Sequence, residues 1–101
     1  MSTRALQEVE KISGKKLTLG NLLSTIRTCD ELSQADFAKK LKISRQYLCD
    51  LEHGRKSLSA KKAQEFSEKL GYSTKQFIAL ALQDSLEQDG IFFNVELKAV
   101  A

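Results

Sequence analysis

Two short segments with helical spacing of their apolar residues lie only three residues apart between Ser33 and Glu52. Ser33 precedes the first segment, residues 34–41, and Ser44 precedes the second, residues 45–52. A serine in that place accepts a hydrogen bond from a free amide of the first helical turn. Because the connection is so short, the two helices must cross steeply and share one apolar wedge. The pattern predicts a helix-turn-helix whose wedge is filled by Phe37, Leu41, Ile43, Leu48 and Leu51, with the small Ala38 where the second helix passes close.

Threonine, serine and glycine mark the ends of three further predicted helices in a chain that has no proline. Thr18 caps residues 19–29, whose leucines and isoleucine form one stripe. The next helix runs over residues 59–70 and is closed by Gly71. The last begins at Ser73, where Gln76 completes the spacing of a capping box, and continues to Gly90. The predicted fold class is therefore all-α, with five helices in a domain over residues 18–89 and an N-terminal arm or short helix over residues 1–17.

After Gly90 the apolar period changes from helical to alternating. The alternation predicts a strand over residues 90–101 with one buried face. A lone strand leaves its backbone groups unpaired, so it needs a partner. We expect that partner to be the same strand of a second copy across a two-fold axis, and the alternative is the chain's own N-terminal arm. The predicted chain is a homodimer, and its dimerisation residues are Ile91, Phe93, Val95 and Leu97.

Positive charge is concentrated in the middle of the chain. Residues 33–62 hold eight Lys and Arg against three acidic residues, whereas residues 63–101 hold three against six. Clustered Lys and Arg are what phosphate contacts require, although a solvated charged face gives the same composition. The second helix of the pair adds a polar block at its outward positions, which are Arg45, Gln46 and Asp50, with Tyr47 and Cys49 at the margins. A helix that enters the major groove by its N-terminal end offers such early side chains to base edges.

Four stretches of the chain carry a resemblance to a known family. They are Leu19-Gly20, Leu-Ser-Gln-Ala-Asp-Phe-Ala over residues 32–38, Ile43-Ser44-Arg45, and Leu51-Glu52-His53-Gly54-Arg55-Lys56. Over about residues 18–83 the chain resembles the Cro/C1-type helix-turn-helix family, also called the Xre family, which includes phage repressors and many bacterial regulators. The resemblance implies a bundle of about five helices that binds double-stranded DNA. It further implies that Gln34 binds phosphate or an adjacent base, and that Arg55 and Lys56 bind the DNA backbone. The residues that it implies face bases are Ser44, Arg45, Gln46 and Asp50.

Two residues depart from the family pattern. Lys42 stands where the turn usually has glycine, and a left-handed lysine costs about 1 kcal/mol, which a packed domain tolerates. Asp50 places a carboxylate on the predicted reading face, where it repels phosphate but can accept from the amino group of cytosine. We expect Asp50 to contribute to specificity by selecting against certain bases rather than to add affinity for DNA.

Other classes of site are disfavoured by the residue inventory. Cys29 and Cys49 lie outside any CxxC arrangement, so neither a disulfide framework nor a four-ligand zinc site is expected. Cys49 and His53 are four apart on one predicted helix, a spacing that can place two ligands on one metal, but two ligands are too few. No nucleophile and base arrangement or phosphate-binding loop is present, so neither an enzyme nor a cofactor is expected. No apolar run is long enough to cross a membrane, and we expect a cytoplasmic protein.

Three functions remain open at this point. The first is a dimeric repressor that binds an inverted-repeat operator. The second, which is compatible with it, is an antitoxin that neutralises a partner toxin through residues 91–100 or residues 3–16 and regulates its own operon. The third is a protein-interaction module without DNA binding, whose acidic C-terminal part makes the contacts.

Overall fold

The computed structural model describes residues 17–100, which divide into two compact units, one over residues 17–56 and one over residues 57–100. All but residue 17 of the predicted N-terminal arm lies outside the described residues. The described chain is helical and contains no strand. The predicted five helices are therefore confirmed, whereas the single domain predicted over residues 18–89 stays a prediction.

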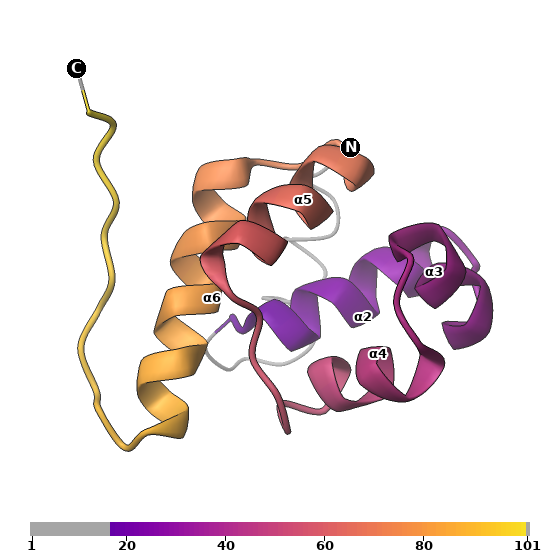
Figure 1. The fold of residues 1–101 in the computed structure, drawn as a ribbon, viewed down its shortest axis with the longest axis horizontal. Helices are drawn as coiled ribbons and strands as arrows, with labels where there is room; N and C mark the ends of the chain where they lie inside the picture. The colour runs from indigo at the N-terminus through magenta and orange to yellow at the C-terminus, as the bar shows by residue number, and fades with distance from the viewer. Residues whose placement is uncertain (1–16, 101) are drawn as a thin grey trace. The chain divides into compact units, whose positions relative to one another are not determined.

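Three helices form the first unit, and their bounds are the predicted ones (Figure 1). They are α2, Leu19–Cys29, α3, Gln34–Leu41, and α4, Arg45–Glu52. Each begins after a capping side chain that accepts from a backbone amide three residues later, at 3.1 Å for Thr18, 3.1 Å for Ser33 and 3.0 Å for Ser44. The caps satisfy amides that a helix start otherwise leaves unpaired, which fixes where α4 begins.

Helix α4 packs against both α2 and α3, and the predicted apolar residues form the core of this unit. Ile43, in the turn, is only half-buried. The helices α2 and α4 approach each other closely at Gly20, where an added Cβ would lie 2.2 Å from the carbonyl oxygen of Leu51. The fully or almost fully buried side chains are Leu19, Leu22, Leu23, Ile26, Phe37, Ala38, Leu41, Leu48 and Leu51.

Lys42 closes α3 in the left-handed conformation, with φ 61° and ψ 44°. Its amide donates to the carbonyl of Lys39, and the amide of Ile43 donates to the carbonyl of Ala38. This pair of bonds is a Schellman motif, which usually has glycine at the left-handed position, as α5 does at Gly71. The turn of the helix-turn-helix therefore forms with a lysine in a glycine conformation.

We expect Lys42→Gly to raise the free energy of unfolding by about 1 kcal/mol, because glycine adopts this conformation without the steric penalty of a Cβ. Urea unfolding followed by circular dichroism measures the change. Lys42→Ala is the control, since it removes the long exposed side chain but keeps the Cβ. An equal gain in the alanine variant would show that the penalty does not come from the backbone.

Two helices and a tail form the second unit. The helices are α5, Ala60–Leu70, and α6, Thr74–Gln88, which pack against each other (Figure 1). Ser67 is fully buried, and its hydroxyl has two polar partners there. It donates to the carbonyl of Gln64 and lies 2.8 Å from the hydroxyl of Thr74. The buried apolar residues of this unit are Leu58, Ala63, Phe66, Phe77 and Ala81.

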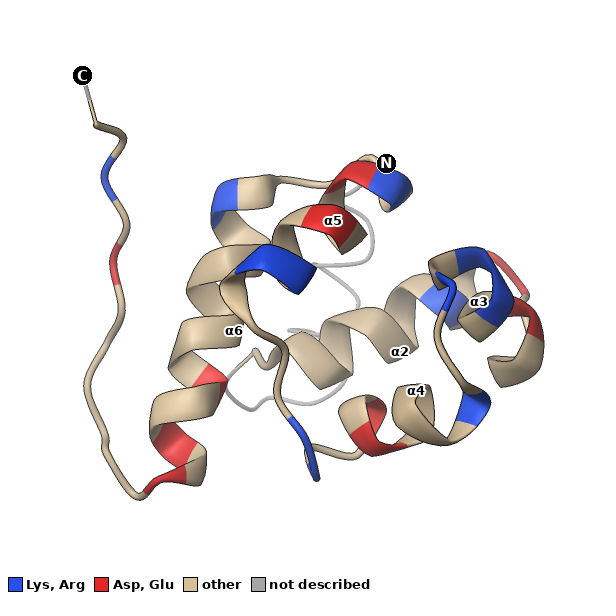
Figure 2. Cartoon of the chain, viewed as in Figure 1, with Lys and Arg blue, Asp and Glu red and all other residues tan. Residues whose placement is uncertain are grey.

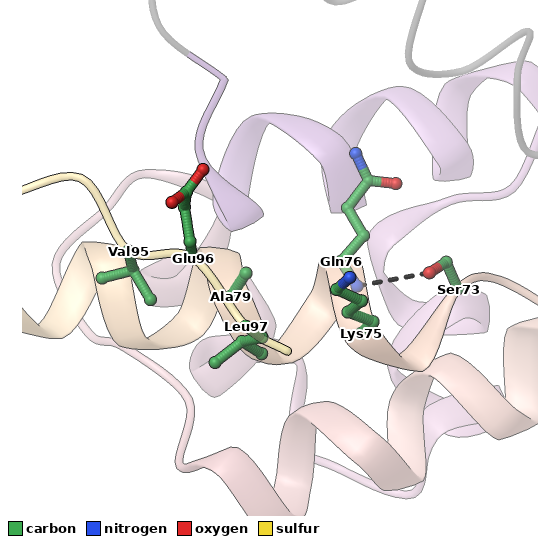
Figure 3. A pocket seen from close by; sticks show the side chains of 7 residues that line it. All are labelled: Ser73, Lys75, Gln76, Ala79, Val95, Glu96 and Leu97. Carbon is green, nitrogen blue, oxygen red and sulfur yellow. Dashed lines mark hydrogen bonds between the residues drawn. The ribbon is translucent and has the colours of Figure 1, made fainter. Parts of the chain in front are cut away.

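Residues 91–100 run as an irregular segment beside α6 rather than as a strand (Figure 1). The predicted pairing of this segment across a two-fold axis therefore stays a prediction. Of the four residues predicted for its buried face, Val95 and Leu97 are half-buried, whereas Ile91 and Phe93 are exposed. A hollow of about 360 Å³ separates the segment from the start of α6, with Ala79 and Leu97 among its walls (Figure 3).

Candidate nucleic-acid interface

The first turn of α4 presents the predicted base-reading residues to solvent. Ser44 is held by its bond to the amide of Tyr47, and this places Arg45 and Gln46 at the first two helical positions. Both side chains are exposed. Arg45 makes no hydrogen bond or ion pair with any other described residue, so its guanidinium keeps all its donors for a ligand.

Asp50, one turn further along α4, contacts three of the predicted site residues. Its Oδ1 accepts from Gln46 Nε2 at 3.1 Å and from Arg55 Nε at 2.9 Å, and its Oδ2 lies 3.8 Å from Lys56 Nζ. The hydrogen bond from Arg55, followed by that from Gln46, holds the pKa of Asp50 below its ordinary value against the opposing effect of burial. Asp50 is therefore an ionised acceptor at neutral pH.

The loop after α4 is fixed to the same residue through its backbone. The amides of Arg55 and Lys56 both donate to the carbonyl of Asp50, at 2.8 Å and 3.4 Å. Lys56 Nζ also lies 5.7 Å from the centre of the Tyr47 ring, within the range of a cation–π contact. Arg45, Arg55 and Lys56 thus place positive charge at both ends of α4 (Figure 2).

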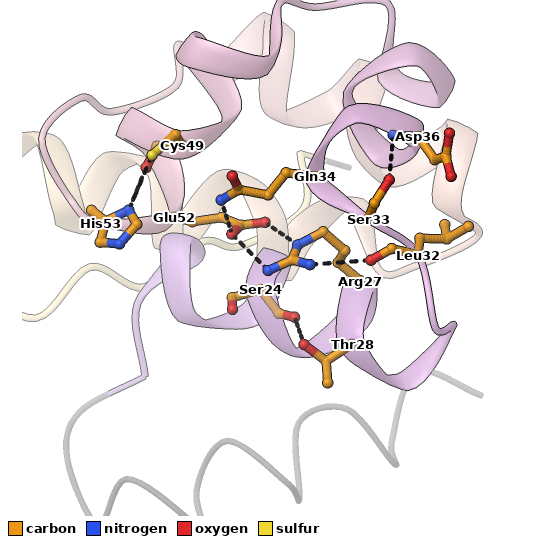
Figure 4. Close-up of polar contacts among 10 residues, drawn as sticks. All are labelled: Ser24, Arg27, Thr28, Leu32, Ser33, Gln34, Asp36, Cys49, Glu52 and His53. Atoms are coloured by element: carbon orange, nitrogen blue, oxygen red, sulfur yellow. Dashed lines mark hydrogen bonds and ion pairs between the residues drawn. The ribbon is translucent and has the colours of Figure 1, made fainter.

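Gln34, predicted to clamp phosphate, starts α3 and lies against the end of α4 (Figure 4). Its amide nitrogen donates to Glu52 Oε1 at 3.0 Å. Glu52 also accepts from Arg27, at 2.8 Å from Nε and 3.2 Å from the second guanidinium nitrogen. The Glu52 side chain is only 4 % exposed and that of Arg27 21 %. A buried ion pair between α2 and α4 therefore positions the amide of Gln34.

Sequence reasoning missed the roles of Arg27 and Glu52. Arg27 is the one basic residue in the last turn of α2, and Glu52 is the last residue of α4. The signal that was present is Arg27 as the one charged residue of an otherwise uncharged helix, because a charge close to a core favours pairing.

The two thiols are unpaired, and no disulfide joins Cys29 to Cys49. Cys49 Sγ lies 3.5 Å from His53 Nδ1 and accepts from Arg55 at 3.3 Å. Within residues 17–100 there is no group of three His, Cys, Asp or Glu side chains placed to hold a metal ion. None of the helices that the structure describes has the length and apolar character of a membrane span.

A family model described as helix-turn-helix matches residues 30–77, a range that contains α3, α4 and α5 and the start of α6. Comparison with curated proteins and with solved structures gives no match. The matched range includes the two capped helices, the left-handed turn and every predicted DNA-contacting residue. Residues 30–77 are therefore similar to the helix-turn-helix family, and this match supports the predicted DNA-binding regulator of the Cro/C1 type.

Proposed function

We propose that this protein is a transcriptional repressor that binds an inverted-repeat operator as a homodimer. The observation that carries the proposal is the exposed, unpaired guanidinium of Arg45 at the first position of α4. In a helix that lies in the major groove, that position faces base edges. Arginine there makes the commonest specific contact, a bidentate pair with O6 and N7 of guanine.

The remaining predicted residues divide between bases and backbone. Gln46 is exposed beside Arg45 and faces bases, with Ser44 and Tyr47 at the edge of the same surface. Arg55 and Lys56 are more than half exposed, at 53 % and 59 %, and supply positive charge for phosphates. Gln34 is held by Glu52 through one of its two N–H groups, which leaves the other for a phosphate oxygen. The proposed surface thus combines base reading in α4 with phosphate contacts from α3 and the loop.

We expect Arg45→Ala to weaken operator binding by about 2 kcal/mol, with a much smaller loss on scrambled DNA, because only the specific complex contains the bidentate base contact. Fluorescence anisotropy with the chain's own upstream DNA and with a scrambled duplex, at one fixed salt concentration, measures both affinities. Arg45→Lys is the matched control. It keeps the charge but not the planar fork, so it should retain scrambled-duplex affinity and still lose specificity. Unchanged operator binding by Arg45→Ala would refute the assignment.

The dimer proposal is supported by the way α6 holds the C-terminal segment. Gln83 is 7 % exposed, and its side-chain amide nitrogen donates to the carbonyl of Phe93. Its amide oxygen accepts from the amide of Val95 at 2.8 Å. A side-chain amide therefore bonds the segment's backbone much as a neighbouring strand would.

In an extended segment alternate residues direct their backbone groups to opposite edges. The backbone carbonyl of Phe93 and the backbone amide of Val95 are bonded to Gln83. The backbone groups of Asn94, Glu96 and Lys98 therefore point to the opposite edge of the segment, away from α6. None of these three residues has a hydrogen bond to another part of the described chain. The outer edge is open to an added strand, and beside it Phe92 and Phe93 are 75 % and 71 % exposed.

A second copy of the segment, added antiparallel, is the occupant that we propose for this edge. Glu96 and Lys98 have opposite charge and both belong to the outer edge. An antiparallel pair centred on Leu97 places each Glu96 opposite Lys98 of the second copy, which is a favourable cross-strand pair. The proposed dimerisation residues Ile91, Phe93, Val95 and Leu97 then lie on one face of a two-stranded ribbon.

We expect Asn94→Pro to weaken dimerisation about tenfold, because proline removes an outer-edge donor from each strand and leaves the bonds to Gln83 in place. Sedimentation equilibrium over a range of concentrations measures the dissociation constant. Asn94→Ala, which keeps the amide, should dimerise like the wild type. A dimer insensitive to Asn94→Pro would place the interface elsewhere.

An antitoxin that also regulates its own operon is the second candidate. It is favoured by the exposed Phe92 and Phe93 at the end of α6 and by the open hollow between the segment and that helix (Figure 3). The other predicted docking segment, residues 3–16, lies outside the described residues. Co-expression with the neighbouring open reading frame tests this role: a complex that co-purifies and is lost in the double variant Phe92→Ser, Phe93→Ser supports it. Retention of an unchanged partner complex by a variant with Arg45→Ala and Gln46→Ala would separate protein binding from DNA binding.

A further inference from the structure

Asp50 does not present a free carboxylate to DNA. Its Oδ1 accepts two hydrogen bonds, from Gln46 and from Arg55, and its Oδ2 faces the ammonium of Lys56. The Asp50 side chain is only 13 % exposed, although the first turn of α4 is open. A carboxylate engaged in this way is poorly placed to accept from cytosine, which was the role expected from the sequence.

The consequence of this arrangement falls on Gln46. An ionised carboxylate only accepts hydrogen bonds, so the amide nitrogen of Gln46 must face Asp50 and the amide oxygen must face away. Rotating the amide would set its oxygen against a carboxylate oxygen. One N–H of Gln46 is therefore occupied, and its second N–H and its oxygen remain available for a ligand.

The two purines differ in what they require from such an amide. Adenine offers an acceptor at N7 and a donor at N6, which match one N–H and one oxygen. Guanine offers acceptors at both N7 and O6, which require two donors from the same side chain. With one N–H bonded to Asp50, Gln46 satisfies adenine fully and guanine only in part.

We propose that Asp50 is a positioning residue that, through Gln46, makes the protein prefer an A·T pair to a G·C pair at the base step facing Gln46. The proposal rests on the proposed operator binding, and it concerns a single position of each half-site. Asp50 itself touches no base in this account, and it acts on the ratio of affinities for two DNA sequences.

The first stage of the test is selection from a random duplex pool with the wild type and with Gln46→Ala. The position at which Gln46→Ala loses its preference identifies the base pair that Gln46 faces. Two operators that differ only there, A·T in one and G·C in the other, are then titrated at constant salt. We expect the wild type to prefer the A·T operator about tenfold.

The second stage repeats the titrations with Asp50→Asn and Asp50→Glu. Asparagine carries both a donor and an acceptor, so it lets the Gln46 amide turn, and we expect the preference to fall to about twofold. It also frees Arg55 and Lys56, so both operators should bind more tightly. Glutamate keeps an acceptor one turn away and should retain most of the preference. The base preference at the Arg45 position is the internal control, because a general distortion of α4 would alter it as well.

The outcomes distinguish a failure of operator binding from a failure of the role of Asp50. Enrichment of no sequence by the wild type would refute the proposed operator binding and this inference with it. A clear consensus that has no A·T preference at the Gln46 position, or that keeps the full preference in Asp50→Asn, would refute only the role of Asp50.

Discussion

Gly20→Ala is expected to lower the free energy of unfolding by about 3 kcal/mol, although alanine is the better helix former. The added Cβ would lie 2.2 Å from the carbonyl oxygen of Leu51 and 3.1 Å from that of Glu52. Both are backbone atoms at the end of α4, so no side-chain rotation relieves the contact. The propensity gain is at most about 1 kcal/mol and smaller near a helix start, so the overlap decides the sign.

Thermal and urea unfolding followed by circular dichroism measure this effect. Ser24→Ala, a small change on the same helix, is the control and should stay within about 0.5 kcal/mol of the wild type. Because the overlap pushes α4 away from α2, operator affinity should fall as well when measured on the folded fraction. A Gly20→Ala protein as stable as the wild type would mean that the two helices do not approach closely at this point.

The bounds of the helices were predictable because their signals are local. A cap acts within three residues of the helix start, and the capping hydroxyls of Thr18, Ser33 and Ser44 all bond as predicted. The left-handed state of Lys42 was predictable for the same reason, since it follows from the turn type alone. Apolar spacing also predicted which residues of α2, α3 and α4 are buried, whereas Ile43 in the turn, predicted to be buried with them, is only half-buried.

The polar contacts of the site were not predictable, because they join residues that are far apart in sequence or compete for one partner. Arg27 and Glu52 are separated by 25 positions, and only the packing of α2 on α4 brings them together. Asp50 had several possible partners within reach on α4 and the next loop. Which of them it binds depends on the path of that loop, which the amides of Arg55 and Lys56 fix.

The C-terminal segment shows a different limit. Its alternating pattern predicts a strand, yet a strand exists only when its backbone bonds to another strand, and the described chain provides a glutamine side chain in that place. A pattern within one chain gives no information on whether the partner is a second copy or another protein. A strand over this segment therefore requires a partner strand, and the described residues supply none.

Glu52→Ala is expected to lower the free energy of unfolding by about 3 kcal/mol, because it leaves the Arg27 guanidinium and the Gln34 amide without their common acceptor. The value lies at the low end for a broken buried pair, since Arg27 is 21 % exposed and water reaches part of it. Urea unfolding measures the loss. Glu65→Ala, which removes an exposed carboxylate paired with Lys62 at 3.6 Å, is the matched control and should cost less than about 1 kcal/mol. A Glu52→Ala loss no larger than this control would contradict the burial of the pair.

The double variant Arg27→Met, Glu52→Met separates stability from positioning. Replacing both members of a buried ion pair by apolar residues of similar volume is often neutral or stabilising, so this protein should recover most of the stability lost in Glu52→Ala. It still lacks the acceptor that orients Gln34, so its operator affinity should remain below that of the wild type even when it is fully folded. If affinity recovers together with stability, the pair serves the fold alone. If only stability recovers, the Glu52 carboxylate serves to orient Gln34 for DNA binding rather than to stabilise the fold.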